Sequence, residues 1–479
     1  MSDMIIPHIV NGSRLEPDEP HVCDRNPAHP DRVVARWGPA DPATVTEACA
    51  AAHVVNRDWR RWTPRARAQV LERAADSLSR QMHQLATELT AEEGKPLVEA
   101  CGEVGRAIRV LRYYAAEADR PSGHLFASSR PGEQVVARHV PLGAVALITP
   151  WNFPLAIPAW KIAPALVFGN TVVWKPSPVT PVTAMRLTEA LMEAGLPPGV
   201  VNLVLGDADV AANLLADPRI VACSFTGSTA AGRSVMGVGA QRGIKTQAEM
   251  GGVNVAVVLA DADLDRAAAR VTAGAFGSSG QKCTATSIVI VEEGVKGPFM
   301  DRLLAQTTAL VVGDPMEEST DLGPLATARQ RDLVGRTLAE AKKAGGTIVL
   351  DGTDGPLPND GWFVGPSIVT DLAPDHPLLG QEVFGPLLFV LGAQDAEESF
   401  ALADRRPYGL TASVFTTSLA SSMTAPDSLH TGVVHINSET TGAEPNVPFG
   451  GIGASGAGGR ELGRAARDFY TETQTVYVA

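Results

Sequence analysis

The chain has 479 residues, of which 45% are hydrophobic, so it is long enough to bury large cores and to divide into two or more units. Asp and Glu number 53 against 40 Lys and Arg, which gives a formal charge of −13 at pH 7. This acidic balance argues against binding along a nucleic-acid backbone, because such binding needs a basic surface.

The five cysteines lie far apart and form no CxxC pair, so the sequence predicts neither a disulfide framework nor a zinc site. The first residues contain no basic stretch ahead of an apolar core, which predicts no secretory signal and favours a cytoplasmic protein. The uncharged segment 141–160 contains four prolines, so we expect it to be a buried, loop-interrupted part of the core and not a membrane span.

Apolar residues between Arg65 and Glu93 recur at steps of three and four, which predicts one amphipathic helix ending near Gly94. Further along the chain, β-prone runs alternate with helix-like segments. Such alternation is typical of parallel strands joined by crossover helices in a nucleotide-binding α/β domain. This first series has strands at 145–149, 171–175, 201–205 and 221–225 and a helix at 183–194.

A second series of the same kind predicts another α/β unit. Its strands are expected at 253–259, 287–291, 387–391, 411–415 and 433–437, with helices at 263–275 and 395–405. Two β-prone segments, 133–139 and 469–478, lie outside both series. Extended arms of this kind often pair across subunits, and the alternative is that each adds a strand to the edge of the chain's own sheet.

Cys283 is the candidate nucleophile among the cysteines. It lies in a segment of small residues, FGSSGQKC at 276–283, between a predicted helix and a predicted strand. Glycines allow a substrate to approach the backbone closely, and the neighbouring cation Lys282 could favour the thiolate. The other reading, a buried structural cysteine, is the one we apply to the remaining four.

Glu249 and Asn152 are candidates for supporting roles. Glu249 ends a short strand just before two glycines, where partial burial could raise its pKa and make it a general base. An exposed glutamate paired with an arginine is the alternative. Asn152 follows a strand on a proline-restrained loop, where its amide could donate to an oxyanion, or it could be an ordinary Asx-turn residue.

Two strand ends carry features that suit phosphate or ribose. The segment 225–232 follows a predicted strand and opens a helix, so Gly227 and Ser228 could present N–H and hydroxyl groups to a pyrophosphate. The segment is not GxGxxG, and Ser also caps ordinary helices. Lys175 ends another strand and could bind ribose hydroxyls or a phosphate, or could simply be solvated.

Seven motifs in this order closely resemble the aldehyde dehydrogenase superfamily. They are PWNFP at 150–154, KPS at 175–177, FTGST at 225–229, EMGG at 249–252, FGSSGQKC at 276–283, EVFGP at 382–386 and PFGG at 448–451. The resemblance covers essentially the whole chain. It implies an α/β fold with a Rossmann-type cofactor domain (1–120 and 141–250), a catalytic domain (251–455) and a β oligomerisation arm (121–140 and 456–479).

The resemblance also implies roles for matching residues. Cys283 would attack the aldehyde carbon, Asn152 and the Cys283 N–H would form the oxyanion hole, and Glu249 would activate the water that resolves the thioester. Lys161 and Glu461 match residues of a proton path, with a structural ion pair as the alternative. The matching cofactor contacts are Trp151, Lys175, Ser177, Pro178, Gly227, Ser228, Glu382 and Phe384.

The implied cofactor is NAD or NADP, and the implied partners are a small-molecule aldehyde and further copies of the chain in a homodimer or homotetramer, with no metal, nucleic acid or membrane. Pro178 stands where many NAD-preferring relatives have a glutamate that binds the adenosine ribose. Without that carboxylate, repulsion of a 2′-phosphate is removed, so NADP use is expected to be open to this chain. Val253 replaces a common lysine after EMGG, with no predicted consequence.

Finer similarity points to the α-ketoglutaric semialdehyde (2,5-dioxopentanoate) dehydrogenases, through EMGG, GQKCTATS at 280–287 and the ending DFYTETQTVYV. Their aldehyde already carries a carboxylate, which Lys282 could attract. The segment 435–446 instead has features of aromatic-aldehyde enzymes. A CoA-acylating enzyme is a further alternative, disfavoured by Glu249, and a non-catalytic descendant is disfavoured by the presence of all three central residues.

Overall fold

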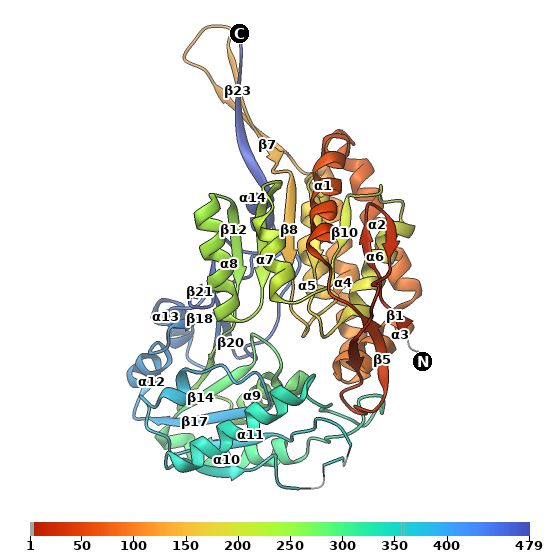
Figure 1. The fold of residues 1–479 in the computed structure, drawn as a ribbon. Coiled ribbons are helices and arrows are strands. Elements are labelled where there is room, and N and C mark those ends of the chain that lie inside the picture. Colours follow the sequence, from red (N-terminus) through yellow and green to blue (C-terminus); the bar gives the residue numbers. More distant parts are fainter. Residues whose placement is uncertain (1–3, 356, 359) are drawn as a thin grey trace.

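The structure is a computed structural model that describes residues 4–355, 357–358 and 360–479. Within these residues two large, mostly parallel sheets form two layered bodies, and a three-stranded ribbon stands away from them (Figure 1). The predicted α/β class is confirmed. In the described part of the chain no helix combines the length and the apolar character needed to cross a membrane.

The first large sheet has the strand order β22-β12-β11-β8-β9-β10-β2-β3. Its five central strands, β12 to β10, are parallel to one another, whereas the strands at both ends pair antiparallel. The strands are β2 (His8–Val10), β3 (Ser13–Leu15), β8 (Ala144–Ile148), β9 (Thr171–Lys175), β10 (Val201–Leu203), β11 (Ile220–Thr226), β12 (Lys245–Glu249) and β22 (Gly456–Ala457).

This sheet is buried on both faces, which is why its strands read as continuous apolar runs. Successive residues of β8 alternate between two cores: Val145 and Leu147 face one, and Ala144 and Ala146 the other. The first core includes α2 (Pro64–Arg80), α3 (Met82–Glu93), α4 (Leu97–Ala115), α5 (Ala156–Val167) and α6 (Pro181–Glu193). The second includes α1 (Pro42–Trp59), α7 (Ala208–Ala216) and α8 (Thr229–Arg242).

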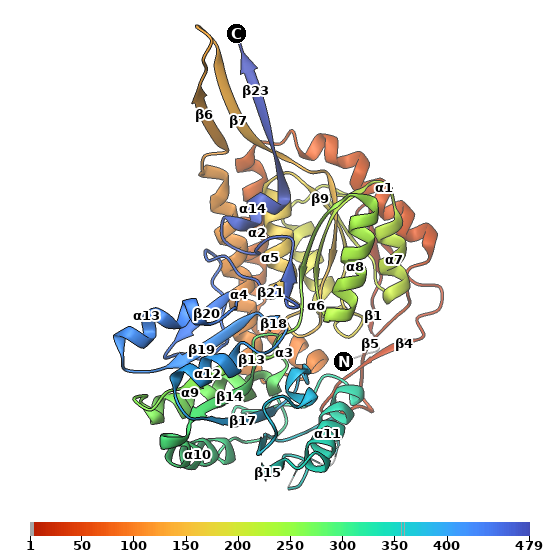
Figure 2. The ribbon, with the colours of Figure 1, turned by 90° about the vertical axis from the view of Figure 1, so that its left-hand side faces the viewer.

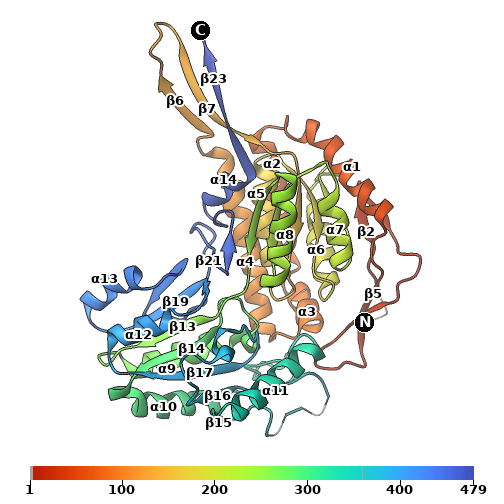
Figure 3. The same ribbon diagram turned by 60° about the vertical axis from the view of Figure 1, so that its left-hand side comes forward.

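The second large sheet has the order β15-β16-β17-β14-β13-β19-β20, and all neighbours except β15 and β16 pair in parallel. Its strands are β13 (Asn254–Val258), β14 (Thr286–Glu292), β15 (Thr347–Leu350), β16 (Ser367–Thr370), β17 (Leu387–Ala393), β19 (Thr411–Phe415) and β20 (Val433–Ile436). The accompanying helices are α9 (Leu264–Phe276), α10 (Glu293–Thr308), α11 (Ala328–Lys343), α12 (Ala396–Ala403) and α13 (Leu419–Ser428). Figures 2 and 3 show this body below the first sheet.

The two outlying segments pair with each other. β7 (Gln134–Pro141) lies between β6 (Gly123–Ala127) and β23 (Thr471–Val478) in an antiparallel sheet, with Thr471 opposite Pro141 and Val478 opposite Gln134. Figure 2 shows this arm leaving the body, and the C-terminus lies at its tip. Neither segment joins an edge of the large sheets, so that alternative is wrong, and β6 is a strand that the sequence pattern did not reveal.

The remaining elements are small. A sheet of order β1-β5-β4 contains β1 (Met4–Ile5), β4 (Val22–Arg25) and β5 (Val33–Trp37), and β18 (Tyr408–Gly409) pairs with β21 (Ile452–Gly453). Three 3₁₀ turns are η1 (Ala116–Asp119), η2 (Gly277–Gly280) and η3 (Pro377–Gly380), and α14 (Ala465–Tyr470) precedes the last strand.

The predicted strands and helices all form, with shifted ends, except that the helix expected over 65–93 is two helices. α2 ends and α3 begins at Gln81, whose φ of −102° and ψ of 11° are not helical. The predicted end at Gly94 is confirmed, because Gly94 closes α3 with a φ of 93°. The three- and four-residue spacing of apolar residues continues across the break, because both helices bury one side in the same core. The spacing therefore does not reveal that one helix ends and another begins.

Candidate active site

The candidate residues gather where an edge of one large sheet meets an edge of the other. Parallel strands end at a common edge, so the order β12-β11-β8-β9 brings Glu249, Ser228, Asn152 and Lys175 to the carboxyl edge of the first sheet. In the second sheet, β13, β14 and β17 are neighbours. The segments that precede them carry Gly252, Cys283 and Glu382, which therefore lie at its amino edge.

Cys283 follows the turn η2, in which Ser278 and Ser279 adopt the left-handed conformation with φ of 52° and 53°. The Cys283 side chain is partly buried, and its carbonyl accepts a hydrogen bond from Asn254 Nδ2 at 2.8 Å. Burial, together with the carboxylates of Glu382 and Glu249, raises the pKa of the Cys283 thiol to about 12. The thiol is therefore protonated at neutral pH in this structure.

The expectation that Lys282 favours the thiolate is wrong. The Lys282 ammonium lies 3.9 Å from Glu99 Oε1, so its charge is partly neutralised by a neighbouring carboxylate. The groups that dominate the surroundings of the Cys283 sulfur are carboxylates, and these disfavour a second negative charge. Sequence adjacency did not determine which charges the sulfur faces.

Asn152 is buried on the loop between β8 and α5, and its side chain reaches the nucleophile segment. Its Nδ2 donates to the carbonyl of Gln281 at 2.9 Å, two residues before Cys283. The Asn152 carbonyl accepts from Lys95 Nζ at 2.7 Å. The Asn152 side chain is thus held against the second body through Gln281, and its main chain is held within the first body through Lys95.

Glu249 is 3% exposed at the end of β12, so it is not the solvated glutamate of the alternative reading. Gly451 N–H donates to its Oε2 at 2.9 Å, while its Oε1 is buried without a partner in the described structure. Burial, and secondarily the charge of Glu461, raises the pKa of Glu249 well above its usual value. A buried carboxyl with a free oxygen and a raised pKa has the properties of a general base.

Lys161 and Glu461 form a buried ion pair near Glu249. The Lys161 ammonium donates to Glu461 Oε1 and, at 2.7 Å, to Ser224 Oγ. Glu461 Oε2 accepts from Trp160 Nε1 at 2.7 Å. The ion pair is therefore present, both groups act on the charge of Glu249, and the proton-path role stays a prediction.

Lys175 and Ser228 occupy the strand-end positions that the sequence predicted. Lys175 is buried, its Nζ donates to Gly206 O at 2.8 Å, and burial lowers its pKa to about 8. Ser228 caps α8 by accepting from Ala231 N at 3.4 Å, and Gly227 N donates to the main chain of Glu249 at 3.1 Å. Ser177 is buried, with Oγ accepting from Val179 N at 3.3 Å, and Pro178 beside it is partly exposed.

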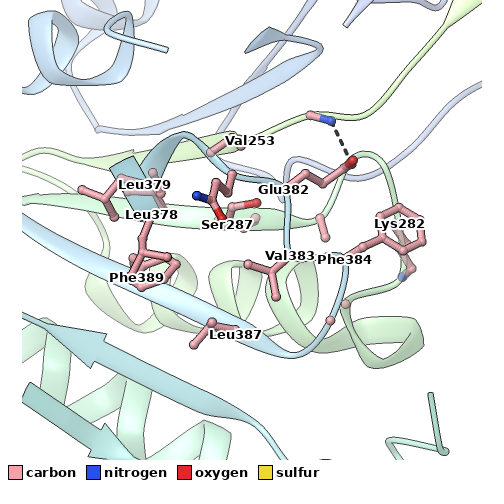
Figure 4. Close-up of a pocket in the computed structure, with 17 residues that line it drawn as sticks. Val253, Lys282, Ser287, Leu378, Leu379, Glu382, Val383, Phe384, Leu387 and Phe389 are labelled. Carbon is pink, nitrogen blue, oxygen red and sulfur yellow. Dashed lines mark hydrogen bonds between the residues drawn. The ribbon is translucent and has the colours of Figure 1, made fainter. Parts of the chain in front are cut away.

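A narrow pocket lies between the Cys283 loop and the segment before β17, and Figure 4 shows its lining residues, among them Val253, Lys282, Glu382 and Phe384. Glu382 Oε1 accepts from Gly252 N at 2.9 Å, and burial raises its pKa to about 7. The Phe384 ring packs edge-on against Trp151, with centroids 5.5 Å apart. Residues from both bodies thus meet beside the nucleophile loop.

These residues fit a dinucleotide. The N-terminal turn of α8 is partly open to solvent at Ser228, and Thr229 Oγ1 has no partner among the described residues. Unpaired N–H groups at a helix N-terminus suit a pyrophosphate. Lys175 would hold ribose hydroxyls or a phosphate nearby, and Glu382 and Phe384 would hold the nicotinamide ribose.

Sequence reasoning missed several residues that shape this site. They include Lys95 just before α4 and Glu99 and Glu103 within its first two turns, which contact the Asn152 and Cys283 loops. Gln281 and Gly451 hold Asn152 and Glu249 through their main chains. No local signal marks such residues, because each acts on a partner that is far away in the chain.

Comparison with known proteins agrees with this geometry. The model of the aldehyde dehydrogenase family matches residues 15–476. A curated relative, an α-ketoglutaric semialdehyde dehydrogenase of Bacillus subtilis (strain 168), is 39% identical over 457 residues, which are 95% of this chain and 93% of the relative.

Solved structures agree as well. Betaine aldehyde dehydrogenase of Staphylococcus aureus, solved in complex with NAD⁺, matches with a TM-score of 0.96 and 28% identity over 99% of this chain and 95% of that one. An NADP-dependent enzyme of E. coli matches with a TM-score of 0.95 and 31% identity, and the match covers 99% of this chain and 98% of that one. The chain therefore belongs to the aldehyde dehydrogenase family and is an NAD(P)-dependent enzyme that oxidises an aldehyde.

Proposed function

We propose that this enzyme oxidises a carboxylated semialdehyde in two covalent half-reactions at Cys283. The proposal rests on one observation: Cys283, Asn152 and Glu249 lie together where the two sheet edges meet. The three side chains supply a nucleophile, an oxyanion donor and a base, which together are the groups that acyl transfer through a thioester requires.

In the first half-reaction the Cys283 sulfur forms a bond to the aldehyde carbon, the π electrons of the carbonyl move onto its oxygen, and the thiol proton passes to solvent water. The oxygen that becomes negative is stabilised by Asn152 Nδ2 and the Cys283 N–H. Only one N–H of the Asn152 amide is needed for Gln281, so the second is available to this oxygen. A bound nicotinamide supplies the hydride acceptor. Loss of hydride from the former aldehyde carbon leaves a thioester on Cys283.

In the second half-reaction Glu249 takes one proton from a water molecule, whose oxygen attacks the thioester and breaks the carbon–sulfur bond. The products are the carboxylate and the Cys283 thiol, which keeps the second proton of the water. The unpartnered Oε1 is the atom that would accept the proton. Lys161 and Glu461 would pass that proton onward, since the charge of the buried Glu461 acts on Glu249 and Lys161 bonds both Glu461 and Ser224.

A carboxylated substrate is supported by the Bacillus relative and by Arg106. Arg106 follows Glu103 by three residues on α4, and its Nη1 donates to Ala443 O at 2.5 Å in the segment 435–446. Ala443, Phe153 and Cys283 pack against the same core. We infer that the other guanidinium nitrogens of Arg106 receive the substrate carboxylate, in competition with the nearby charge of Glu444.

We further propose the domain organisation, assembly and cofactor range that the family resemblance implies. Residues 1–120 and 141–250 form the cofactor domain, 251–455 the catalytic domain, and 121–140 and 456–479 an arm that pairs subunits into a homodimer or homotetramer. Pro178 removes the carboxylate that would repel a 2′-phosphate, so NADP is accepted beside NAD. The enzyme works in the cytoplasm and needs no metal or nucleic acid.

The test is a panel of aliphatic, aromatic and carboxylated aldehydes assayed with NAD and NADP, with and without CoA. We expect the highest kcat/KM for a carboxylated semialdehyde and a free acid as product in every assay. An equal response across the panel would contradict the substrate assignment. Formation of an acyl-CoA thioester would instead contradict the hydrolytic second half-reaction.

A further inference from the structure

The first turns of α4 contact both loops that form the oxyanion hole. Lys95, just before the helix, is 1% exposed, and its Nζ donates to Asn152 O at 2.7 Å and to Glu103 Oε2 at 2.6 Å. The same ammonium lies 4.2 Å from the centre of the Phe153 ring. Glu103 Oε1 accepts from the N–H groups of Leu155 and Ala156 at 2.9 and 3.1 Å. Lys95 and Glu103 therefore hold the loop 152–156 from two sides.

The charge balance of this cluster supports a fixed position for Lys95. Glu93 and Glu103 both lie near its ammonium, at 3.8 and 2.6 Å. Burial raises the pKa of Glu93 to about 8, so this carboxyl is mostly neutral at pH 7. Lys95 therefore pairs most closely with Glu103, and breaking a buried pair whose hydrogen bonds are satisfied is costly.

Glu99, one turn further along α4, contacts the nucleophile segment. Ser278 N donates to Glu99 Oε1 at 2.9 Å, the Ser278 hydroxyl donates to Oε2, and Lys282 Nζ lies 3.9 Å from Oε1. Ser278 has a φ of 52°, which costs a non-glycine residue conformational energy unless its surroundings hold it. Glu99 accepts two hydrogen bonds from Ser278 and so holds this residue, five positions before Cys283, in its left-handed conformation.

These contacts join different parts of the fold. α4 packs in the helical layer of the first sheet, whereas Ser278 and Lys282 lead into β14 of the second. The oxyanion hole needs one donor from each part, the Asn152 amide and the Cys283 N–H. Their separation has to be kept within a fraction of an ångström, because misplacement of about 1 Å can cost on the order of 10²-fold in rate.

We propose that Lys95 and Glu99 are positioning residues that set the distance between the two oxyanion donors, Lys95 through the Asn152 loop and Glu99 through the Ser278 turn. The proposal rests on the proposed function, because it assigns both donors to the same oxygen. Neither residue touches the substrate. Their loss is therefore expected to slow both formation and hydrolysis of the thioester, because both steps put negative charge on the same oxygen, and to leave cofactor binding unchanged.

The experiment is stopped-flow measurement of the burst of reduced cofactor, which reports thioester formation, beside the slow phase, which reports hydrolysis. The variants are Glu99→Ala, Glu99→Asp and the double variant Lys95→Met with Glu103→Gln, which leaves no unpaired buried charge. Glu47→Gln, at an exposed position on α1, is the matched control. Ser278→Ala, which removes a single hydroxyl donor, serves if a larger change prevents folding.

We expect the burst rate to fall about tenfold or more in Glu99→Ala, less in Glu99→Asp, and not in Glu47→Gln. The hydrolysis rate is expected to fall as well, because water attack on the thioester again puts negative charge on this oxygen. The cofactor Kd is expected to stay within about twofold, a split that general loosening of the fold would not produce. A burst rate in Glu99→Ala within about twofold of the wild type would overturn the proposal, as would a matching loss of cofactor affinity. Absence of any burst in the wild type would count against the proposed function instead.

Discussion

Asn152 donates from its side-chain amide to the carbonyl of Gln281, 129 positions later in the chain, at 2.9 Å. This bond connects the loop after β8 in the first sheet with the loop before β14 in the second. Because Cys283 is only two residues further on, the contact keeps an amide donor close to the sulfur before any substrate binds. The chemistry assigned to the two loops depends on that closeness.

Replacing Cys283 with Ala is expected to abolish aldehyde oxidation and to leave cofactor binding intact, because the sulfur forms the bond to the substrate while the cofactor contacts lie on other segments. Steady-state assays and a fluorescence titration with reduced cofactor measure the two properties. Cys23→Ala, at a partly exposed cysteine of β4, is the control and should retain activity. Turnover in Cys283→Ala would remove the nucleophile assignment.

Replacing Glu249 with Gln is expected to preserve the burst of reduced cofactor and to slow the phase that follows by about 10² or more, since the amide cannot accept the proton of water. In the wild type the slow phase should speed up as pH rises through the raised pKa of Glu249, because only the ionised carboxylate acts as a base. The variant should lack this rise. A normal second phase in the variant would mean that another base acts.

Replacing Pro178 with Glu is expected to shift the cofactor preference toward NAD, by about tenfold in the ratio of kcat/KM values. A carboxylate at this position would repel the 2′-phosphate of NADP and accept hydrogen bonds from the ribose hydroxyls of NAD. Pro178→Gln is the matched control: glutamine has the shape of glutamate but no charge, so this variant should shift the ratio less. An unchanged ratio in Pro178→Glu would leave the cofactor argument without support.

Replacing Lys161 with Met is expected to lower the free energy of unfolding by about 3 kcal/mol, because it leaves the Glu461 carboxylate buried without its cation. The double variant with Glu461→Gln should recover most of this loss, since the glutamine oxygen still accepts from Trp160 Nε1. Denaturant unfolding of both variants measures the difference. If the two variants have equal free energies of unfolding, the unpaired charge of Glu461 is not the cause of the loss.

Replacing Arg106 with Met is expected to raise KM for a carboxylated semialdehyde about tenfold and to change KM for an uncharged aldehyde of similar length by less than about twofold. The physical reason is loss of a charge-assisted hydrogen bond to the substrate carboxylate. Arg57→Met, at an exposed arginine of α1, is the control. Equal effects on both substrates would assign Arg106 a structural role only.

The sequence by itself determined the elements and the location of the site along the chain. Apolar runs between turn residues encode β8, β9 and β14 locally, and parallel strands bring the ends of neighbouring strands to one edge, so Asn152, Lys175 and Glu249 could be assigned to strand ends without coordinates. The seven ordered motifs then indicated the family.

Only the tertiary structure decided the electrostatic state of those residues. A pKa depends on burial and on charges brought close by folding, so the protonated Cys283, the raised pKa of Glu249 and the pairing of Lys282 with Glu99 have no local signature. The same holds for Lys161 and Glu461, which form one ion pair from positions 300 residues apart. Periodicity records which side of an element is buried, whereas the partner of a buried charge is set by how distant elements pack.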